Sequence, residues 1–249
     1  MPTALIFGGS GKVARHLTPL LVSNSYKVHS IIRNESQSSD LKSLGAQPIV
    51  QSIETSSVAD LTSTIKDTKP DVVIWAAGAG GGNPERTKTV DHEGAIKSFD
   101  ATAAAGVKRY IIVSALDVRD KENKPVPDWY DDGDKERSEK VWGFIGPYMK
   151  AKYAADRELV TGNQKRGLEY TIVRPGGLSQ DPAKGTVAAG KVHLNSMVSR
   201  EDVAAVVMRC IQEDGTKGLA FDVVGGDTPI ADAVKEVADG KIDTFDGFY

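Results

Sequence analysis

The chain has 249 residues, a formal net charge of −3 at pH 7 and a single cysteine. This length predicts one large domain, or one domain with a small appendage. The small net charge excludes a global basic field of the kind that attracts nucleic acid or an anionic membrane. One cysteine excludes an intramolecular disulfide, and no stretch resembles an export signal or a membrane span, so we expect a cytoplasmic protein.

The first element is predicted by an apolar run, Ala4-Leu5-Ile6-Phe7, that meets a glycine cluster and continues into apolar residues at helical spacing. This pattern is typical of a buried strand, a tight turn and a helix. The spacing Gly8-x-x-Gly11-x-x-Ala14 suits a dinucleotide-binding turn, because glycine lets the backbone approach a pyrophosphate beside a helix N-terminus. A tight turn without a ligand is the alternative. The residues expected to hold the dinucleotide here are Gly8, Gly9, Ser10, Gly11, Lys12 and Val13.

A basic residue, Arg33, follows the predicted second strand at residues 26–32. Folds that select NAD(H) place an acidic residue there to accept hydrogen bonds from the ribose, whereas a basic residue pairs with the 2′-phosphate of NADP(H). Lys12 is a second candidate for the same anion. The sequence therefore favours NADP(H), with Glu35 as the contrary feature and solvated surface charges as the alternative.

Three further strands are predicted at residues 48–51, 71–78 and 108–114, with helices between them. This alternation predicts an α/β Rossmann fold, a doubly wound and mostly parallel sheet with helices on both faces. Ligands of such sheets bind beyond the carboxyl ends of the strands. The residues expected to contact the cofactor at these ends are Ser52, Ile53, Ala76, Ala77, Gly78 and Ser114.

Residues 117–140 interrupt the alternation with prolines and a high density of charge. We expect an exposed connection, too polar for the core, that forms either a lid over the site or a solvated insertion. Large apolar side chains in and beyond this segment indicate an apolar ligand, with ordinary packing as the alternative. These side chains are Trp129, Trp142, Phe144, Leu178 and Phe248.

Three side chains supply the groups needed for carbonyl reduction: Ser114, and Tyr148 and Lys152 on a predicted helix. In such a reaction a nicotinamide gives hydride while a phenol protonates the developing alkoxide. We expect Lys152 to bind the nicotinamide ribose and to lower the pKa of the phenol from its ordinary value of about 10. Ser114 is expected to orient the substrate oxygen. In the alternative, Tyr148 only packs and Lys152 alone contacts the cofactor.

The remaining chain begins with a sixth strand at residues 168–174, which leaves about seventy residues for the rest. We therefore expect a single domain, with a cofactor-binding core at 1–175 and a mostly substrate-side cap at 176–249. Cys210 lies among apolar residues at helical spacing and is expected in the core. The four histidines show no ligand-like pairing, so no metal site is expected.

Several of these motifs together resemble the atypical short-chain dehydrogenase/reductases, and among them the NAD(P)-binding NmrA-like and YwnB-like group. The stretches that carry the resemblance are Gly8-x-x-Gly11-x-x-Ala14, residues 74–80, residues 89–95, Ala151-Lys152 with Ala155-Asp156, residues 171–178 and residues 199–204. The resemblance implies a Rossmann fold that binds NADP(H). It places further cofactor contacts at the turn after the sixth strand, at Pro175, Gly176, Gly177 and Leu178.

The resemblance leaves three functions open, because members range from reductases to cofactor-sensing regulators. The expected function is an NADP(H)-dependent oxidoreductase that acts on a small carbonyl compound or alcohol. The second is a regulator that senses NADP(H) and binds a protein partner without turnover. The third is a nucleotide-sugar epimerase or dehydratase.

Overall fold

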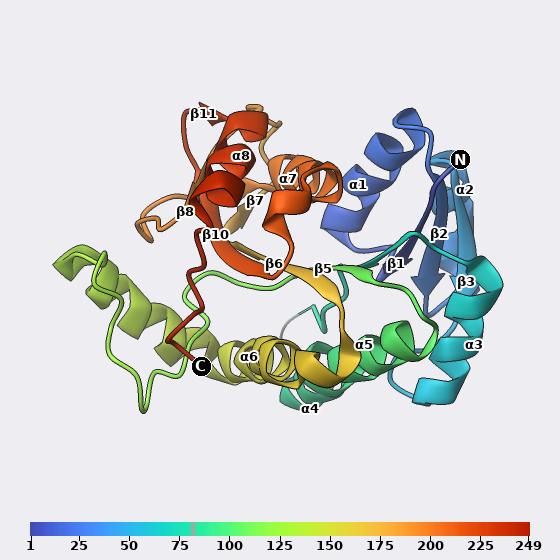
Figure 1. The fold of residues 1–249 in the computed structure, drawn as a ribbon, viewed down its shortest axis with the longest axis horizontal. Helices are drawn as coiled ribbons and strands as arrows, with labels where there is room; N and C mark the ends of the chain where they lie inside the picture. The colour runs from blue at the N-terminus through green and yellow to red at the C-terminus, as the bar shows by residue number, and fades with distance from the viewer. Residues whose placement is uncertain (81–82) are drawn as a thin grey trace.

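The computed structural model describes residues 1–80 and 83–249, and a nine-stranded sheet runs through its centre (Figure 1). The strand order is β11-β8-β10-β6-β5-β4-β1-β2-β3. Seven strands run parallel, while β8 pairs antiparallel with β10 and with β11. Their bounds are β1 (Thr3–Phe7), β2 (Lys27–Ile32), β3 (Ala46–Val50), β4 (Val72–Trp75), β5 (Arg109–Val113), β6 (Glu169–Pro175), β8 (Thr186–Gly190), β10 (Leu219–Gly225) and β11 (Thr228–Pro229).

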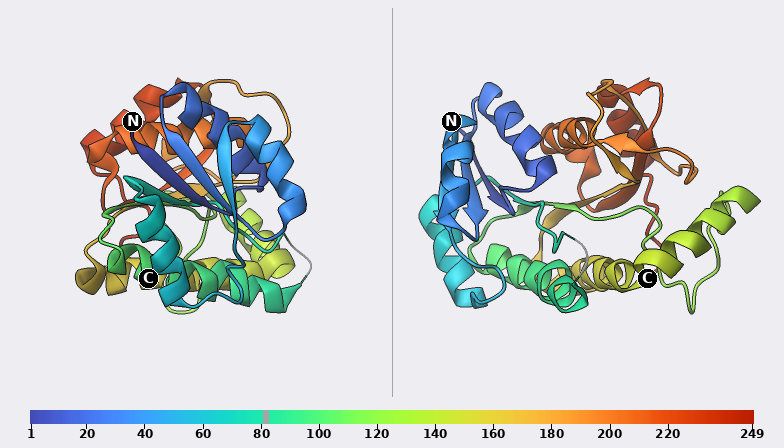
Figure 2. Two further views of the ribbon diagram at one scale, coloured as in Figure 1. Left: turned by 90° about the vertical axis from the view of Figure 1, so that its right-hand side faces the viewer. Right: turned by 180° about the vertical axis from the view of Figure 1, so that it is seen from behind.

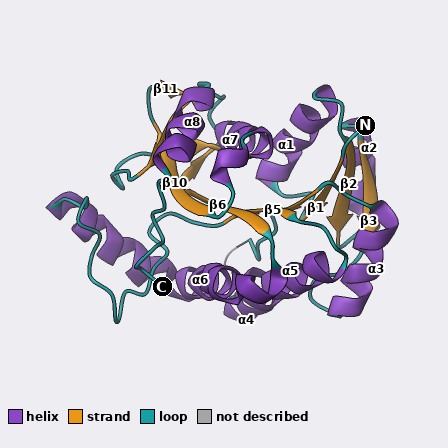
Figure 3. Cartoon of the chain, in the orientation of Figure 1, coloured by secondary structure: helices purple, strands orange, loops and turns teal. Residues whose placement is uncertain are grey.

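Helices cover both faces of the sheet, as the two helical layers in Figures 2 and 3 show. One face carries α1 (Lys12–Ser23), α7 (Arg200–Gln212) and α8 (Ile230–Gly240), and the other carries α3 (Val58–Thr68), α5 (Ala95–Ala104) and α6 (Asp132–Arg166). Short elements complete the chain: α2 (Ser38–Ser43), α4 (Pro84–Arg86), a π-helical segment (Thr87–Gly94), and a small ladder of β7 (Leu178–Ser179) with β9 (Val198–Ser199). The predicted doubly wound Rossmann fold is confirmed.

Strand β1 shows why this sequence forms a sheet buried on both sides. Side chains alternate across a strand, so Ala4 and Ile6 enter the core beneath α1 and α7, while Leu5 and Phe7 enter the core beneath α3 and α5. All four are fully buried. A continuous apolar run is therefore what this central strand requires.

The C-terminal part of the chain builds both sheet and helices. Residues 176–249 contribute β8, β10 and β11 to the central sheet, with α7 and α8 packed on it. Cys210 is buried in α7 as predicted, and burial raises the pKa of its thiol to about 12. Within the described ranges, no helix combines the length and apolar character that crossing a bilayer requires.

The segment at residues 117–140 differs from its prediction as an exposed connection. Residues 132–140 form the first turns of α6, and Asp117 and Arg119 are almost completely buried as an ion pair, with 3.0 Å between Oδ1 and Nε. Arg174, itself 3.2 Å from Asp222, donates a hydrogen bond to the carbonyl of Val118. For Asp117 and Arg119 the prediction was wrong, because their charges neutralise each other inside the protein, which no local hydropathy pattern indicates. Residues 122, 123, 125, 126 and 128 are exposed, as predicted.

Helix α6 is much longer than its predicted part around Tyr148. Asp131 and Asp134 form a capping box at its start, and the backbone leaves helical geometry at Ile145, just before Pro147. The turns before this bend project away from the sheet, at the left of Figure 1 and the right of the rear view in Figure 2. One face of this projecting part borders the groove described next.

Candidate active site

A groove follows the carboxyl edge of the sheet and consists of three adjoining cavities. The first, of about 190 Å³, and the central one, of about 960 Å³, share Ser10 and Arg33 in their walls. The central cavity and the third, of about 280 Å³, share Ser114 and Tyr148. Because neighbouring cavities share walls, the groove is continuous from the end of β2 to the bend in α6.

The glycine turn after β1 forms the floor of the first two cavities. Gly8 has φ +77°, and a Cβ added there would collide with Ala77 at the end of β4. Gly11 starts α1 and offers no side chain to the free N–H groups of its first turn. A Cβ at Gly11 would likewise lie 3.0 Å from the Gly8 carbonyl oxygen, so the close turn requires glycine at both positions. The free N–H groups at the start of α1 suit an anion such as a pyrophosphate.

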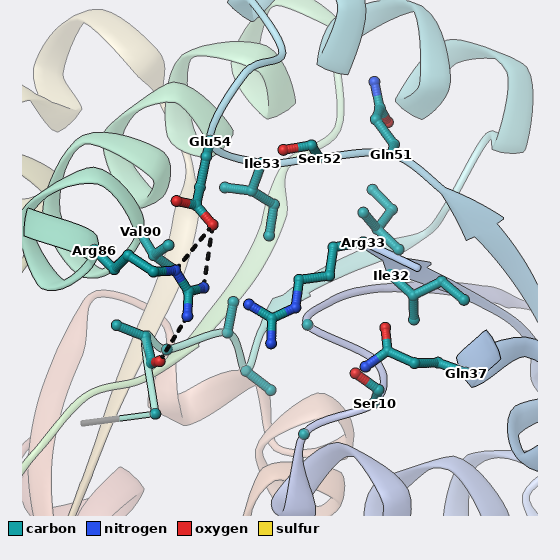
Figure 4. Close-up of a pocket in the computed structure, with 18 residues that line it drawn as sticks. Ser10, Ile32, Arg33, Gln37, Gln51, Ser52, Ile53, Glu54, Arg86 and Val90 are labelled. Atoms are coloured by element: carbon teal, nitrogen blue, oxygen red, sulfur yellow. Dashed lines mark hydrogen bonds and ion pairs between the residues drawn. The ribbon is translucent and has the colours of Figure 1, made fainter. Parts of the chain in front are cut away.

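Arg33 reaches from the end of β2 into the first cavity, and its guanidinium group points across the cavity toward the side of Arg86 (Figure 4). On the opposite side Arg86 lies 3.1 Å from Glu54, an ion pair that ties the loop after β3 to α4. The carboxylate of Glu54 in this wall is therefore already paired with Arg86, whereas the guanidinium group of Arg33 faces the cavity. Glu35, the feature that argued against NADP(H), is not among the residues that line the groove.

Most predicted cofactor residues line the first two cavities. Gly9 lies behind the wall, where a Cβ would overlap Ser30. Pro175, Gly176 and Gly177 line the third cavity, on the far side of Ser114 from the glycine turn. The predicted residues in the walls of the first and central cavities are Gly8, Ser10, Gly11, Lys12, Val13, Arg33, Ser52, Ile53, Ala76, Ala77, Gly78, Ser114, Tyr148, Lys152 and Leu178.

Lys152 is buried at the centre of the groove in a fixed arrangement. Its Nζ lies 3.1 Å from Asp91 Oδ1 and 5.7 Å from the centre of the Tyr148 ring. The second oxygen of Asp91 accepts a hydrogen bond from the N–H of Ala79. Burial opposes the charge of Lys152, but Tyr148 and Asp91 outweigh it and raise its pKa to about 12. The ammonium group is therefore charged and held beside the phenol.

The hydroxyl of Ser114 has a partner that the sequence did not predict. Its Oγ donates to Asp156 Oδ2 at 2.5 Å, and both side chains are buried. Burial raises the pKa of Asp156 to about 6, despite the hydrogen bond from Ser114. The proton that we expected Ser114 to direct at a substrate points to Asp156 instead, so above that pKa Ser114 offers oxygen lone pairs to the groove.

Tyr148 also differs from its prediction. Burial raises the pKa of its phenol, and the opposing effect of Lys152 is smaller. The expected net lowering was wrong, because removing the phenol from water disfavours the phenolate more than one ammonium group favours it. Tyr148 is consequently held in the protonated form, which is the form that donates a proton.

The apolar side chains singled out in the sequence divide into two groups. Phe144 and Leu178 line the central cavity. Trp129 instead packs edge-on against Phe248, with 5.6 Å between ring centres, and Trp142 donates its indole N–H to Asp117. These tryptophans stabilise the buried connection and do not line the groove's described cavities.

One histidine, His193, lies beside two carboxylates that are distant in the sequence. His193 Nδ1 lies 2.6 Å from Asp134, and Asp131 is close by. Asp134 already accepts hydrogen bonds from the N–H groups of Leu194 and Asp131 and completes the cap of α6. We interpret the cluster as a link between this helix start and residues 193–194.

Sequence reasoning missed the residues that reach the groove from distant elements. Asp91 comes from the π-helical segment and lines the central cavity. Asp156, two turns beyond Tyr148 on α6, lies behind the wall and acts through Ser114. Others are Gln37, Gln51, Glu54 and Arg86 around the first cavity, Arg200 in the central cavity and Arg137 in the third. The spacing of Tyr148, Lys152 and Asp156 indicated one helix face, but only the fold places Ser114 and Asp91 against it.

A glycine cradle between β1 and α1, at the carboxyl edge of a parallel sheet, defines a Rossmann-type dinucleotide-binding protein. Comparison with known proteins gives the family. The chain belongs to the NAD(P)H-binding family, whose model matches residues 8–214. The predicted membership of the atypical short-chain dehydrogenase/reductases is confirmed. The match also supports the predicted nicotinamide cofactor, without distinguishing NAD(H) from NADP(H).

Relatives extend over almost the whole chain. The protein is 40% identical to UPF0659 protein C216.03 of Schizosaccharomyces pombe, over 94% of each chain. It is 35% identical to the uncharacterized sugar epimerase YhfK of Bacillus subtilis, over 93% of this chain and 98% of the relative. A solved Bacillus halodurans protein assigned to the NAD-dependent epimerases/dehydratases is 30% identical, with a TM-score of 0.78, over 95% of this chain and all of the other. The family is thus oxidoreductase-like and epimerase-like.

Proposed function

We propose that the protein is an NADP(H)-dependent oxidoreductase that reduces a small carbonyl compound. One observation carries the proposal: the cavity above the glycine turn and the apolar third cavity meet at Ser114 and Tyr148. A dinucleotide lying along the first two cavities brings its reactive end to this junction. A substrate in the third cavity meets it there, beside the only group on this wall that we expect to donate a proton.

The chain's own residues then supply the acid and its support. When bound, the nicotinamide supplies the hydride. Tyr148 protonates the carbonyl oxygen and becomes a phenolate, which the adjacent Lys152 ammonium group stabilises. Asp91 holds Lys152 in place, so that the lysine also faces the ribose side of the groove. When Asp156 is protonated, Ser114 is free to donate to the carbonyl oxygen. When Asp156 is ionised, the Ser114 proton points to it, and Ser114 can only accept a hydrogen bond from the hydroxyl of the alcohol product.

The preference for NADP(H) is supported by the charges in the first cavity. Arg33 is directed into it, while the nearby carboxylate of Glu54 is paired with Arg86. A guanidinium group binds a phosphate with two parallel hydrogen bonds, which suits the 2′-phosphate of NADP(H).

The proposal is tested by NADPH oxidation over a panel of aldehydes, ketones and quinones with Tyr148→Phe. We expect a loss in kcat of about 10²- to 10⁴-fold, the usual contribution of a general acid. Tyr153→Phe is the matched control, because Tyr153 lies on the same helix and packs against Phe245 away from the groove. Full turnover by Tyr148→Phe would exclude the phenol from the mechanism. Tight NADPH binding without turnover of any compound would favour a cofactor-sensing regulator.

A nucleotide-sugar epimerase or dehydratase is the second candidate, favoured by the names of the relatives from Bacillus. Such a substrate needs polar partners for its diphosphate and sugar, whereas the third cavity is small and mostly apolar. Calorimetric titration with UDP-sugars separates the two candidates. Strong binding would favour the epimerase.

A further inference from the structure

The third cavity has an apolar body with polar groups at its two ends. Its inner end is formed by Ser114 and Tyr148, where the proposed reduction takes place. Its outer part carries Arg137, on the projecting turns of α6. The apolar walls between them consist of Leu116, Val141, Ile145, Met149, Pro175, Leu178 and Leu194. A ligand that fills this cavity therefore meets a proton donor at one end and a cation at the other.

One face of α6 connects these two ends. Arg137, Val141, Ile145 and Tyr148 follow one another at spacings of four, four and three residues, which places them on a single stripe of the helix. All four line the cavity. Arg137 and Tyr148 are eleven residues apart on this helix. At a rise of about 1.5 Å per residue, their Cα atoms lie at most roughly 16 Å apart, and the bend at Ile145 shortens this distance.

The cation at the outer end is available to a ligand. Arg137 Nη1 lies 3.7 Å from Asp134 Oδ1, which is close enough for an ion pair but beyond ordinary hydrogen-bond length. Asp134 is occupied as the helix cap, because it accepts from Leu194, Asp131 and His193. The Arg137 side chain is 47% exposed, so it reaches both the cavity and solvent.

The other charged side chain in the wall does not oppose an anion strongly. Asp117 is paired with buried Arg119 at 3.0 Å and accepts a hydrogen bond from Trp142 Nε1 at 3.1 Å. Arg137 is therefore the cationic side chain in the wall of this cavity, and its guanidinium group is only loosely paired with Asp134. The Asp134 carboxylate beside the guanidinium group weakens its attraction for any anion, and it repels a dianion such as a phosphate more strongly than a single carboxylate.

We infer that the substrate is a carbonyl compound with an apolar ring-containing body and a carboxylate remote from the carbonyl, bound by Arg137. This inference rests on the proposed reductase function for the position of the carbonyl. A volume of about 280 Å³ lies just below the range of roughly 300–1,000 Å³ for ligand pockets, so the body is one or two rings. The guanidinium fork matches a carboxylate with two hydrogen bonds, and the leucine and valine walls cover the rings.

The experiment uses methyl ketones of increasing length: para-acetylbenzoate, acetylnaphthoate and acetylbiphenyl carboxylate, each compared with its uncharged methyl ester. NADPH oxidation gives kcat/KM for every acid and ester. We expect the wild type to prefer the acid over the ester by about 10- to 100-fold at the best length, the effect of one hydrogen-bonded charge. Equal kcat/KM for acids and esters at all lengths would overturn the inference.

Variants on α6 assign the preference to one side chain. Arg137→Gln should reduce the acid-to-ester ratio to near one, while Arg137→Lys should retain part of it. Lys140→Gln removes the same charge from an exposed position of the same helix, where Lys140 pairs with Glu136, and should keep the wild-type ratio. A preference that survives in Arg137→Gln would overturn the inference, and thermal melting checks that this variant folds.

Calorimetric binding of the acids to the NADP⁺ complex separates this inference from the proposed function. Acid binding that disappears in Arg137→Gln supports the carboxylate site even if no compound is turned over, and the reductase proposal alone then fails. Turnover of neutral ketones only, without measurable binding of any acid, leaves the reductase in place and overturns the carboxylate site.

Discussion

The two ends of the groove are built from different material. At the nucleotide end, the glycine turn presents backbone, and its shape follows from φ angles and the absence of side chains. At the reaction end, buried ionisable side chains do the same work: Lys152 is fixed by Asp91, and Ser114 by Asp156. The first kind of wall is sensitive to added atoms and indifferent to pH. The second tolerates small changes in volume but depends on which groups carry protons.

The largest effect is expected from Gly8→Ala, which breaks the backbone-built end. Alanine at φ +77° costs about 1–2 kcal/mol in left-handed strain, and its overlap with Ala77 adds about 1–3 kcal/mol of overpacking. Gly106→Ala is the control, because Gly106 has φ +81° and no neighbour within 4 Å of an added Cβ. The control variant therefore has the left-handed backbone strain without any overlap with a neighbour.

Urea unfolding and NADPH fluorescence titration measure this difference. We expect Gly8→Ala to lose more free energy of unfolding than Gly106→Ala and to lose NADPH binding, which the control retains. Equal losses in the two variants would show that contact between the turn and β4 is unimportant.

The reaction end is tested next, through pH. Folding raises the pKa of Asp156 from an ordinary 3.8 to about 6, so the folded state binds this proton more tightly than the unfolded state. The contribution of Asp156 to the free energy of unfolding is therefore complete below pH 3.8, and it is lost as the pH rises from 3.8 to about 6. At 1.36 kcal/mol per pKa unit the loss is about 3 kcal/mol.

Asp156→Asn should remove this dependence, so that the variant loses less free energy of unfolding than the wild type between pH 4 and about pH 7. Asp232→Asn, at an exposed position of α8, is the control and should keep the wild-type pH dependence. Identical pH profiles for Asp156→Asn and wild type would mean that Asp156 is ionised without penalty.

The smallest of these effects concerns Arg33, the side chain that gives the backbone-built end its selectivity. Arg33→Gln should weaken NADPH binding by about 10- to 100-fold and leave NADH binding nearly unchanged, because only NADPH carries the 2′-phosphate. Arg15→Gln is the control, since Arg15 is exposed on α1 and paired with Asp40. Parallel changes in the affinities for both cofactors would contradict this role of Arg33.

The difference between the nucleotide end and the reaction end of the groove also explains which parts of the site the sequence could predict. The glycine turn, the strand ends and Arg33 are local features, because each follows from neighbours within a few residues of a strand. Asp91 and Arg137 reach the groove only through the π-helical segment and the long α6, which tertiary packing determines. The burial of Asp117 and Arg119 was missed for a related reason. The two charges pair with each other, but the groups that enclose them come from distant elements, such as Trp142, which donates to Asp117, and Arg174, which donates to the carbonyl of Val118.

The protection of Cys210 has a practical consequence for watching the groove at work. Its thiol is buried and almost entirely protonated at neutral pH, so it resists alkylating reagents. A cysteine introduced by Phe144→Cys, at a side chain that is 90% exposed beside the central cavity, would therefore be the one thiol that a maleimide dye labels quickly. Such a dye would report occupancy of the groove in real time, without further engineering of the chain.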